Sequence, residues 1–301
     1  MSKLKILFLS PEDPSLRQMA EGRLKKTGAD LFTVGSAEGN PGHENLKKYD
    51  LVVTLSKDIP PIPSFVRHVH WPVSLHKTPQ IIDDEITLWI QELIQTYRSP
   101  TTQKEPLQDR SWGKYYQEEK TAWDLGEPSP PFVRLFKKGE LKKGKMAVPG
   151  CGKGHEVLFF AKENFEVTAI DFAKEALQIV QERLQKASLE AKLLQKDFLD
   201  LGREEDGRYD YILEQTCYCA IEPVKRGNYV RAAHRLLRPQ GELIALFYDI
   251  DNVDGPPFGT SRDEILKRFS PFFKIESLEK SVFSHERRKG KEWLGRFIKR
   301  A

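Results

Sequence analysis

The stretch from Met146 to Glu156, MAVPGCGKGHE, limits what this chain can fold into more than any other part of it. A short apolar run leads into a loop whose glycines, Gly150, Gly152 and Gly154, leave the backbone almost bare of side chains. Apolar residues at helical spacing follow, so the pattern predicts a strand, a glycine-rich turn and a helix, as in a nucleotide-binding βαβ unit. The next apolar run ends at Asp171, roughly 20 residues further on, where an acidic side chain in such units binds a ribose hydroxyl.

The loop and its aspartate leave two ligands open. A dinucleotide would place its pyrophosphate at the N-terminus of the helix, whereas S-adenosylmethionine (AdoMet) has no phosphate and would fill the same crevice differently. Glycine also serves tight turns and close helix packing, so the loop alone does not choose between the two ligands. The choice depends on the segments around the loop.

Those segments carry a family resemblance. They are WGKYYQEEKTAWDLGEPSPPFVRL at 112–135, KDFLD at 196–200, QTCYCAIEP at 215–223, DGPPF at 254–258 and RKGKEWLGRF near the end of the chain. With the loop, they resemble the thiopurine methyltransferase family of class I AdoMet-dependent methyltransferases, and within it the thiol, thiocyanate and halide methyltransferases of plants and bacteria. The resemblance covers residues 112–299 and implies a Rossmann-like seven-stranded sheet with S-adenosyl-L-methionine as the cofactor.

The resemblance also implies which residues bind this cofactor. They are the aromatic lid of Trp112, Tyr116 and Trp123, the loop glycines Gly150 and Gly152, Asp171, the adenine-contacting pair Asp197 and Phe198, and Gln215. Aromatic residues suit a sulfonium, because a ring face attracts a desolvated cation by ~1 to 2 kcal/mol. Tyr116 stands where the most similar relatives usually have tryptophan, and Gln215 where they often have tyrosine. Asp197 and Phe198 are expected to end the third strand of the sheet.

On the acceptor side, Arg226 matches a family arginine and is expected to attract an anionic acceptor. Tyr229, Tyr248 and Phe258 are candidates for an apolar acceptor pocket. A soft anion already carries its electron pair and needs no general base, so the protein mainly aligns the reactants and removes water. If the acceptor is a neutral thiol, Glu222 or Asp249 is a candidate base.

The first hypothesis is therefore an S-methyltransferase of bisulfide, thiocyanate or small thiols, with halides as further candidates, acting by direct displacement. The alternatives are methylation of selenium or tellurium species or of heterocyclic thiols, and an AdoMet-binding regulatory protein with an interaction module. The proline-rich tetrapeptide that begins with Asp or Asn in methyltransferases of nucleic-acid amino groups does not follow the fourth predicted strand. Its absence argues against DNA or protein-amide methylation.

Residues 1–97 are predicted to form a separate small α/β domain, followed by a linker over 98–111 and the methyltransferase domain over 112–301. The segments ILFLS, RQMAEG, DLVVTL and HWPV resemble the low-molecular-weight tyrosine phosphatase and arsenate reductase family, which implies a parallel sheet. That family's cysteine nucleophile is replaced by Ser10, its arginine by Leu16, and its acid by Ser74 or Leu75. No cysteine precedes Cys151, so thiolate chemistry is not available there. We expect this degenerate domain to bind a protein partner or mediate self-association.

Composition excludes several other classes. A net charge of +4 over 301 residues, with both signs interspersed, is not a nucleic-acid-binding signature. No apolar run approaches the roughly 20 residues of a membrane helix, so no membrane partner is expected. Three cysteines cannot form a disulfide framework, which favours a cytoplasmic protein. Cys217 and Cys219 have no nearby His or Cys to complete a metal site, so no metal is expected.

Overall fold

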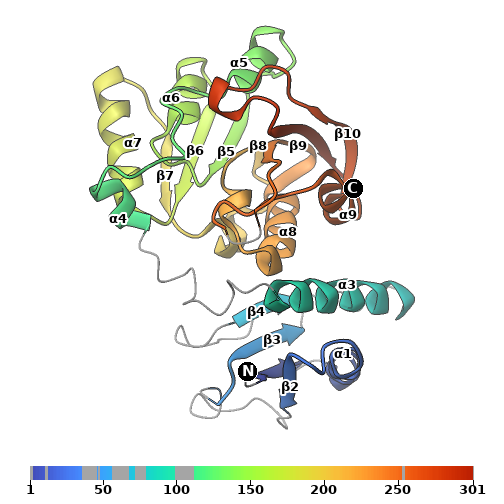
Figure 1. Ribbon diagram of the computed structural model, residues 1–301. Coiled ribbons are helices and arrows are strands. Elements are labelled where there is room, and N and C mark those ends of the chain that lie inside the picture. Colours follow the sequence, from blue (N-terminus) through green and yellow to red (C-terminus); the bar gives the residue numbers. More distant parts are fainter. Residues whose placement is uncertain are drawn as a thin grey trace. The chain divides into compact units, whose positions relative to one another are not determined.

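The computed structural model describes residues 3–10, 13–35, 46, 48–55, 68–71, 79–98, 112–252 and 255–300. The chain divides into two compact units, residues 1–104 with 223–228 and residues 105–222 with 229–301 (Figure 1). Most of the linker predicted over 98–111 lies outside the described residues, as do Ser74, Leu75 and Asp254.

The smaller unit contains a four-stranded parallel sheet, as predicted. Its strands are β1 (Leu4–Leu9), β2 (Phe32–Gly35), β3 (Leu51–Leu55) and β4 (His68–Trp71), in the order β2-β1-β3-β4. Successive residues of β1 enter two cores, because side chains alternate between the faces of a strand. Ile6 and Phe8 pack in one core, whereas Leu7 and Leu9 pack in the other.

Two helices cover the first of these cores. Helix α1 (Pro14–Thr27) begins where the Asp13 carboxylate accepts a hydrogen bond from the Ser15 amide at 2.8 Å, an N-cap contact. Helix α3 (Pro79–Arg98) buries the predicted apolar face, with Ile82, Ile86, Trp89, Ile90, Leu93 and Ile94. The side chains of Ile81 and Leu88, assigned to the same face, lie outside the description.

The larger unit contains the predicted seven-stranded sheet, in the order β10-β11-β9-β8-β5-β6-β7. Its strands are β5 (Lys145–Pro149), β6 (Glu166–Asp171), β7 (Lys192–Gln195), β8 (Tyr209–Gln215), β9 (Leu237–Tyr248), β10 (Phe273–Lys280) and β11 (Glu292–Lys299). Strand β11 is antiparallel to both of its neighbours, and the other pairings are parallel.

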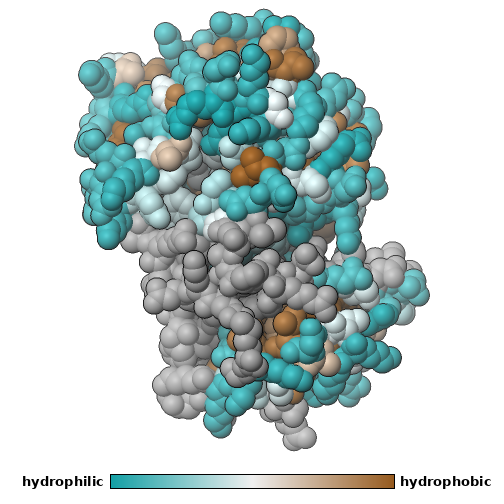
Figure 2. Space-filling model, in the orientation of Figure 1, coloured by the Kyte–Doolittle hydropathy of each residue, from teal (hydrophilic) through white to brown (hydrophobic). Residues whose placement is uncertain are grey.

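Helices pack on both faces of this sheet. Apolar residues of α5 (Pro130–Lys137), α6 (His155–Lys162) and α7 (Lys174–Ala187) share one core with Met146 and Val148. Residues of α8 (Arg226–Leu236) and α9 (Arg262–Phe269) share the other core with Ala147. Because β5 is buried on both faces, its sequence is a continuous apolar run. On the face shown in Figure 2, the described surface of the larger unit is mainly hydrophilic.

One predicted boundary was wrong. Strand β7 ends at Gln195, and Asp197 instead caps the 3₁₀ turn Phe198–Asp200 by accepting a hydrogen bond from the Leu199 amide at 2.9 Å. Strand β9 contains a local irregularity at residues 239–241. There the pairing shifts between Tyr209 and Tyr211, and Gln240 has a φ of 62°. An aspartate prefers a cap to a strand interior, and the long β9 continues past a local irregularity.

The strand order indicates where a ligand would bind to this sheet. From β5 the chain builds outward through β6 and β7 on one side, and β8 and β9 add on the other, so the order reverses between β5 and β8. Ligands of open α/β sheets bind at such a switch point, beyond the carboxyl ends of the strands. We call the loops beyond the carboxyl ends of β5 to β9 the carboxyl edge. Across the described part of the chain, no helix is long and apolar enough to span a membrane.

Candidate active site

The glycine loop forms the centre of the carboxyl edge. Gly150, Gly152 and Gly154 have φ values of +55°, +54° and +72°, in the left-handed region that favours glycine. A Cβ atom added at Gly150 would lie 2.9 Å from the Cβ of Cys217, and one added at Gly152 would lie 3.3 Å from the Tyr116 hydroxyl. The loop is therefore a cradle of bare backbone, as its sequence predicted.

Asp171 ends β6 beside this cradle. Its side chain is 8% exposed, and its two carboxylate oxygens accept hydrogen bonds from the Gly152 amide at 3.1 Å and the Ala173 amide at 2.9 Å. Burial raises the pKa of Asp171, although these amides lower it in part. A carboxylate has about four lone-pair sites, so it can accept further bonds from hydroxyl groups beside these amides. This arrangement suits a ribose diol.

An aromatic cluster lies beside the loop. Its rings come from α4 (Trp112–Gln117) and from the segment that follows this helix. Trp123 is its hub, with ring centroids 5.3 Å from Trp112, 5.7 Å from Tyr115 and 5.8 Å from Tyr116. Burial and the nearby Asp171 carboxylate raise the pKa of Tyr116, so its phenol stays neutral. The structure thus brings Trp112, Tyr116 and Trp123 together, with Tyr116 directly beside Gly152. We call the four rings of Trp112, Tyr115, Tyr116 and Trp123 the lid cluster.

The two predicted adenine residues differ in placement, because Asp197 is exposed and Phe198 is buried. Phe198 is 4% exposed and packs against Tyr229 at a centroid distance of 5.0 Å, so its contact with a ligand stays a prediction. Phe172, which follows Asp171 directly, is 51% exposed. An exposed aromatic ring next to the Asp171 carboxylate can pack against a flat base. Sequence reasoning missed Phe172, although its place immediately after a strand-ending acid was a signal.

The residues at the end of β8 are largely engaged within the protein. The fully buried Glu214 carboxylate accepts a hydrogen bond from the Tyr218 amide at 2.8 Å and one from the Tyr229 hydroxyl at 2.6 Å. Tyr229 is itself fully buried, so its role in an acceptor pocket stays a prediction. The Gln215 side-chain oxygen accepts from Thr216 at 3.0 Å, and its amide nitrogen has no hydrogen-bond partner within the described residues.

The cysteines beside these residues are thiols. Burial, with Glu214 and Asp171 nearby, holds the pKa of Cys217 well above its usual range, so this sulfur stays protonated. Cys219 is buried, and its sulfhydryl donates to the Thr216 carbonyl. In the parts of the chain that the structure covers, no group of His, Cys, Asp or Glu could hold a metal ion.

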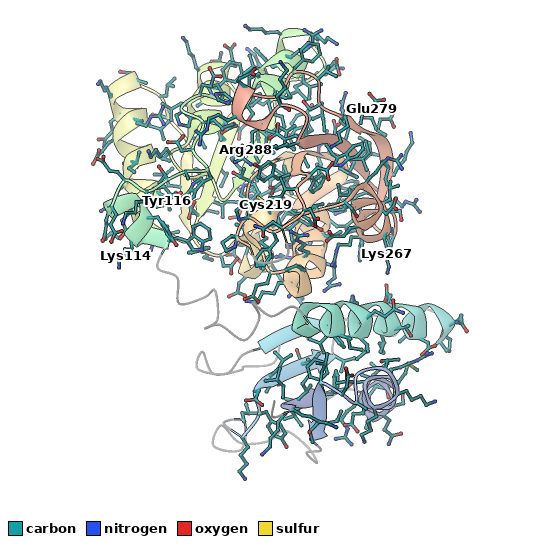
Figure 3. The ribbon with its side chains drawn as sticks, viewed as in Figure 1. Lys114, Tyr116, Cys219, Lys267, Glu279 and Arg288 are labelled. Atoms are coloured by element: carbon teal, nitrogen blue, oxygen red, sulfur yellow. The ribbon has the colours of Figure 1, made fainter. Side chains whose placement is uncertain are left out.

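Two arginines lie among the residues considered for the acceptor side. Arg226 opens α8 and is 1% exposed. Arg288, on the loop between β10 and β11, is 6% exposed and its guanidinium lies 4.0 Å above the ring of Tyr248, the last residue of β9. Its Nη2 donates to the Trp123 carbonyl at 3.5 Å, and its Nη1 makes no hydrogen bond within the described residues. Tyr116, Cys219 and Arg288 come from three separate segments of the larger unit (Figure 3).

Sequence reasoning missed Arg288, although it begins the motif RKGKEWLGRF. Of the other acceptor-side residues, Phe258 is 8% exposed and its amide donates to the Cys219 carbonyl at 2.7 Å. Asp249 forms an ion pair with Lys280, and Glu222 is half-buried. The roles of Arg226, Tyr248, Glu222 and Asp249 stay predictions.

Gly150→Ala tests the cradle. The new side chain would combine an unfavourable φ with a clash against Cys217, so we expect the free energy of unfolding to fall by about 2 kcal/mol or more. Binding of S-adenosylhomocysteine (AdoHcy), the demethylated form of AdoMet, should weaken about tenfold. Gly139→Ala is the matched control, because Gly139 has a φ of +72° but nothing within 4 Å of its Cβ position. Calorimetric affinities that are equal in the two variants would contradict the prediction.

Comparisons with known proteins extend this description. The family model for thiopurine S-methyltransferase matches residues 107–299. The chain is 34% identical over 200 residues to thiocyanate methyltransferase 1 of Brassica oleracea, covering 65% of this chain and 87% of that protein. It is 34% identical over 193 residues to probable thiol methyltransferase 2 of Arabidopsis thaliana, covering 62% and 84%. A Burkholderia thailandensis 1,6-didemethyltoxoflavin N1-methyltransferase structure has a TM-score of 0.54 at 14% identity, covering 67% and 92%, which shows the class of fold.

Proposed function

The chain belongs to the thiopurine S-methyltransferase family and is an AdoMet-dependent methyltransferase, and we propose that it methylates small thiols or soft anions such as bisulfide and thiocyanate. The observation that carries the choice of acceptor is Arg288. This buried guanidinium stacks on Tyr248 beside the carboxyl edge and keeps one N–H group without a partner in the described structure. Such a group favours an anion, because burial strengthens a charge-assisted hydrogen bond.

The residues at the switch point fit AdoMet. Gly150 and Gly152 would accommodate the cofactor against bare backbone, and Asp171 would accept from the ribose hydroxyls. Phe172 and Asp197 are the proposed adenine contacts, and Trp112, Tyr116 and Trp123 would shield the sulfonium. The ring faces attract a cation that has lost its water, and the neutral Tyr116 adds no opposing charge. Gln215 remains a proposed contact.

Bound AdoMet supplies a methyl group on a positively charged sulfur, which a nucleophile displaces in one in-line step. The chain's own part is to hold the anion and exclude water. We propose that Arg288 attracts the anion and that Tyr248 and Phe258 line its pocket. Arg226 stays a candidate that the family resemblance implies. An anionic acceptor needs no proton removed, and so bisulfide leaves as methanethiol without help from a base.

For the smaller unit we propose a degenerate phosphatase-like fold with an interaction role. Leu16, at the position of the family's arginine, is 4% exposed and packs in the core of the unit. Arg17, the next residue, lies 3.6 Å from the Glu21 carboxylate, which supports a structural use of its charge. Ser10 supplies a hydroxyl rather than a thiol at the nucleophile position, and serine is a weak nucleophile without an activating base.

The test of function is a direct assay. Purified full-length protein is mixed with AdoMet and sodium sulfide, and methanethiol is measured in the headspace, with thiocyanate, iodide and a heterocyclic thiol run in parallel. We expect sulfide and thiocyanate to be methylated faster than the heterocyclic thiol. Turnover of the heterocyclic thiol alone would overturn the proposed acceptor class. AdoHcy binding without turnover of any acceptor would favour a regulatory protein.

A further inference from the structure

The polypeptide around Trp123, the hub of the lid cluster, is held from two sides. On one side, the Asp124 carboxylate accepts hydrogen bonds from Lys153 Nζ and from His155 Nε2, each at 2.8 Å. Both partners belong to the segment that closes the glycine loop and starts α6. The carboxylate also accepts from the Gly126 amide at 3.0 Å, which fixes its orientation.

On the other side, the loop between β10 and β11 binds the backbone of the same segment. Arg287 donates to the Ala122 carbonyl at 2.5 Å and to the Asp124 carbonyl at 2.8 Å. Arg288 donates to the Trp123 carbonyl at 3.5 Å. This loop therefore binds three consecutive carbonyl groups, those of residues 122 to 124, from which it is separated by 163 or 165 residues in the sequence.

The partners of Asp124 are themselves held in place. Arg183, on α7, donates to the Lys153 carbonyl at 2.5 Å and to Nδ1 of His155 at 3.3 Å. A guanidinium has no acceptor, so His155 Nδ1 must accept and Nε2 carries the hydrogen that Asp124 receives. Burial raises the pKa of Asp124, but the hydrogen bonds from Lys153 and Gly126 lower it by more, so the carboxylate is ionised at neutral pH.

We infer that Asp124 is a positioning residue that ties the lid cluster to the glycine loop, so that Trp123 and Tyr116 are already held beside this loop before AdoMet binds. This inference rests on the proposed use of the lid cluster as a cofactor contact. Asp124 does not touch the reacting atoms; it acts through Trp123 and Lys153. Side chains that are held in place in advance bind a ligand more tightly, because ligand contacts do not have to offset the entropy lost in ordering them.

Asp124→Asn tests the inference. The amide has nearly the same shape, but it carries no charge. Its NH₂ group must replace one carboxylate oxygen, so it faces either the Lys153 ammonium or the His155 and Gly126 donors, and that arm of the tie is lost. We expect the KM for AdoMet and the Kd of AdoHcy to rise about tenfold, the usual scale for one lost charge-assisted hydrogen bond. The kcat at saturating AdoMet should stay within about twofold of wild type. Asp124→Glu should restore part of the affinity.

Asp210→Asn is the matched control. Asp210 is also a part-buried aspartate. Burial raises its pKa, but hydrogen bonds from the Lys145 backbone amide and the Arg238 side chain lower the pKa by more. It lies near the amino end of β8, away from the carboxyl edge. Its substitution should reduce stability without moving either KM or Kd.

Several outcomes would overturn the inference. One is a wild-type AdoHcy Kd in Asp124→Asn, and another is a loss of kcat with unchanged KM, as expected from a smaller folded fraction. If Asp124→Asn does not fold, Lys153→Met removes one arm of the tie, and unchanged AdoHcy affinity in that variant would count equally against it. The AdoHcy Kd needs no acceptor, so failure of the proposed acceptor class would leave this measurement intact.

Discussion

Asp171→Asn is expected to weaken AdoHcy binding by about 100-fold or more. The carboxylate holds two backbone amides and would accept two ribose hydroxyls, and each hydrogen bond to a buried charge contributes about 1.5 to 3 kcal/mol. Asparagine loses one acceptor and turns an NH₂ group toward Gly152 or Ala173. Calorimetry gives the affinity, and the rise in Tm caused by AdoHcy gives an independent reading, because a ligand stabilises only the form that binds it.

The pH dependence has a definite sign. Burial raises the pKa of Asp171 above its usual value of 3.8, so protonation begins at a higher pH than for an exposed aspartate. The protonated form loses acceptor capacity, and AdoHcy affinity should fall as the pH is lowered toward that pKa. Asp171→Asn should lack this dependence. Near-wild-type affinity in the variant would place the ribose elsewhere.

Arg288→Met is expected to lower kcat/KM for bisulfide and thiocyanate by about 100-fold. Methionine keeps an apolar stem against Tyr248 but removes the buried charge that would hold the anion. AdoHcy affinity should change only severalfold, through the lost bond to the Trp123 carbonyl. The assay compares initial rates for thiocyanate and for a neutral small thiol at saturating AdoMet.

Controls separate charge from geometry. Arg288→Lys keeps the charge without the planar fork and should recover part of the thiocyanate rate. Lys289→Met removes a neighbouring exposed charge and should have little effect. An equal loss for anionic and neutral acceptors in Arg288→Met would mean that the residue supports the fold of the loop and does not select the acceptor. Arg226→Met in the same assay tests the arginine implied by family resemblance.

Local patterns predicted much of the molecule. The order of apolar run, glycines and helical spacing around Gly150 predicted β5, its loop and α6, and the run ending at Asp171 predicted β6. The parallel sheet of the smaller unit and the inward face of α3 were also confirmed. These features depend on residues close together in the chain, so their signal is present in any short window of sequence.

The misses share a different cause. Arg288 and Asp124 looked like ordinary charged residues, because their partners Tyr248, Lys153 and His155 lie elsewhere in the chain. Phe198 and Tyr229, which the family resemblance and the sequence suggested for the site, lie in a buried core, and their roles there stay predictions. The end of β7 was missed because the Asp197 side chain caps the next turn instead of extending the strand. The sequence pattern does not show which of the two hydrogen-bonding arrangements is more stable.

By itself, the sequence determined the class of fold, the glycine cradle, the acidic residue beside it and the family of AdoMet-dependent enzymes. Each of these follows from short-range spacing or from motifs in a fixed order. The tertiary structure alone decided which charges meet at the carboxyl edge and how the lid cluster is tied to the glycine loop. Those contacts join segments that are separate in the sequence, 163 residues apart for Arg287 and Asp124, and only the packing of the sheet brings them within hydrogen-bonding distance.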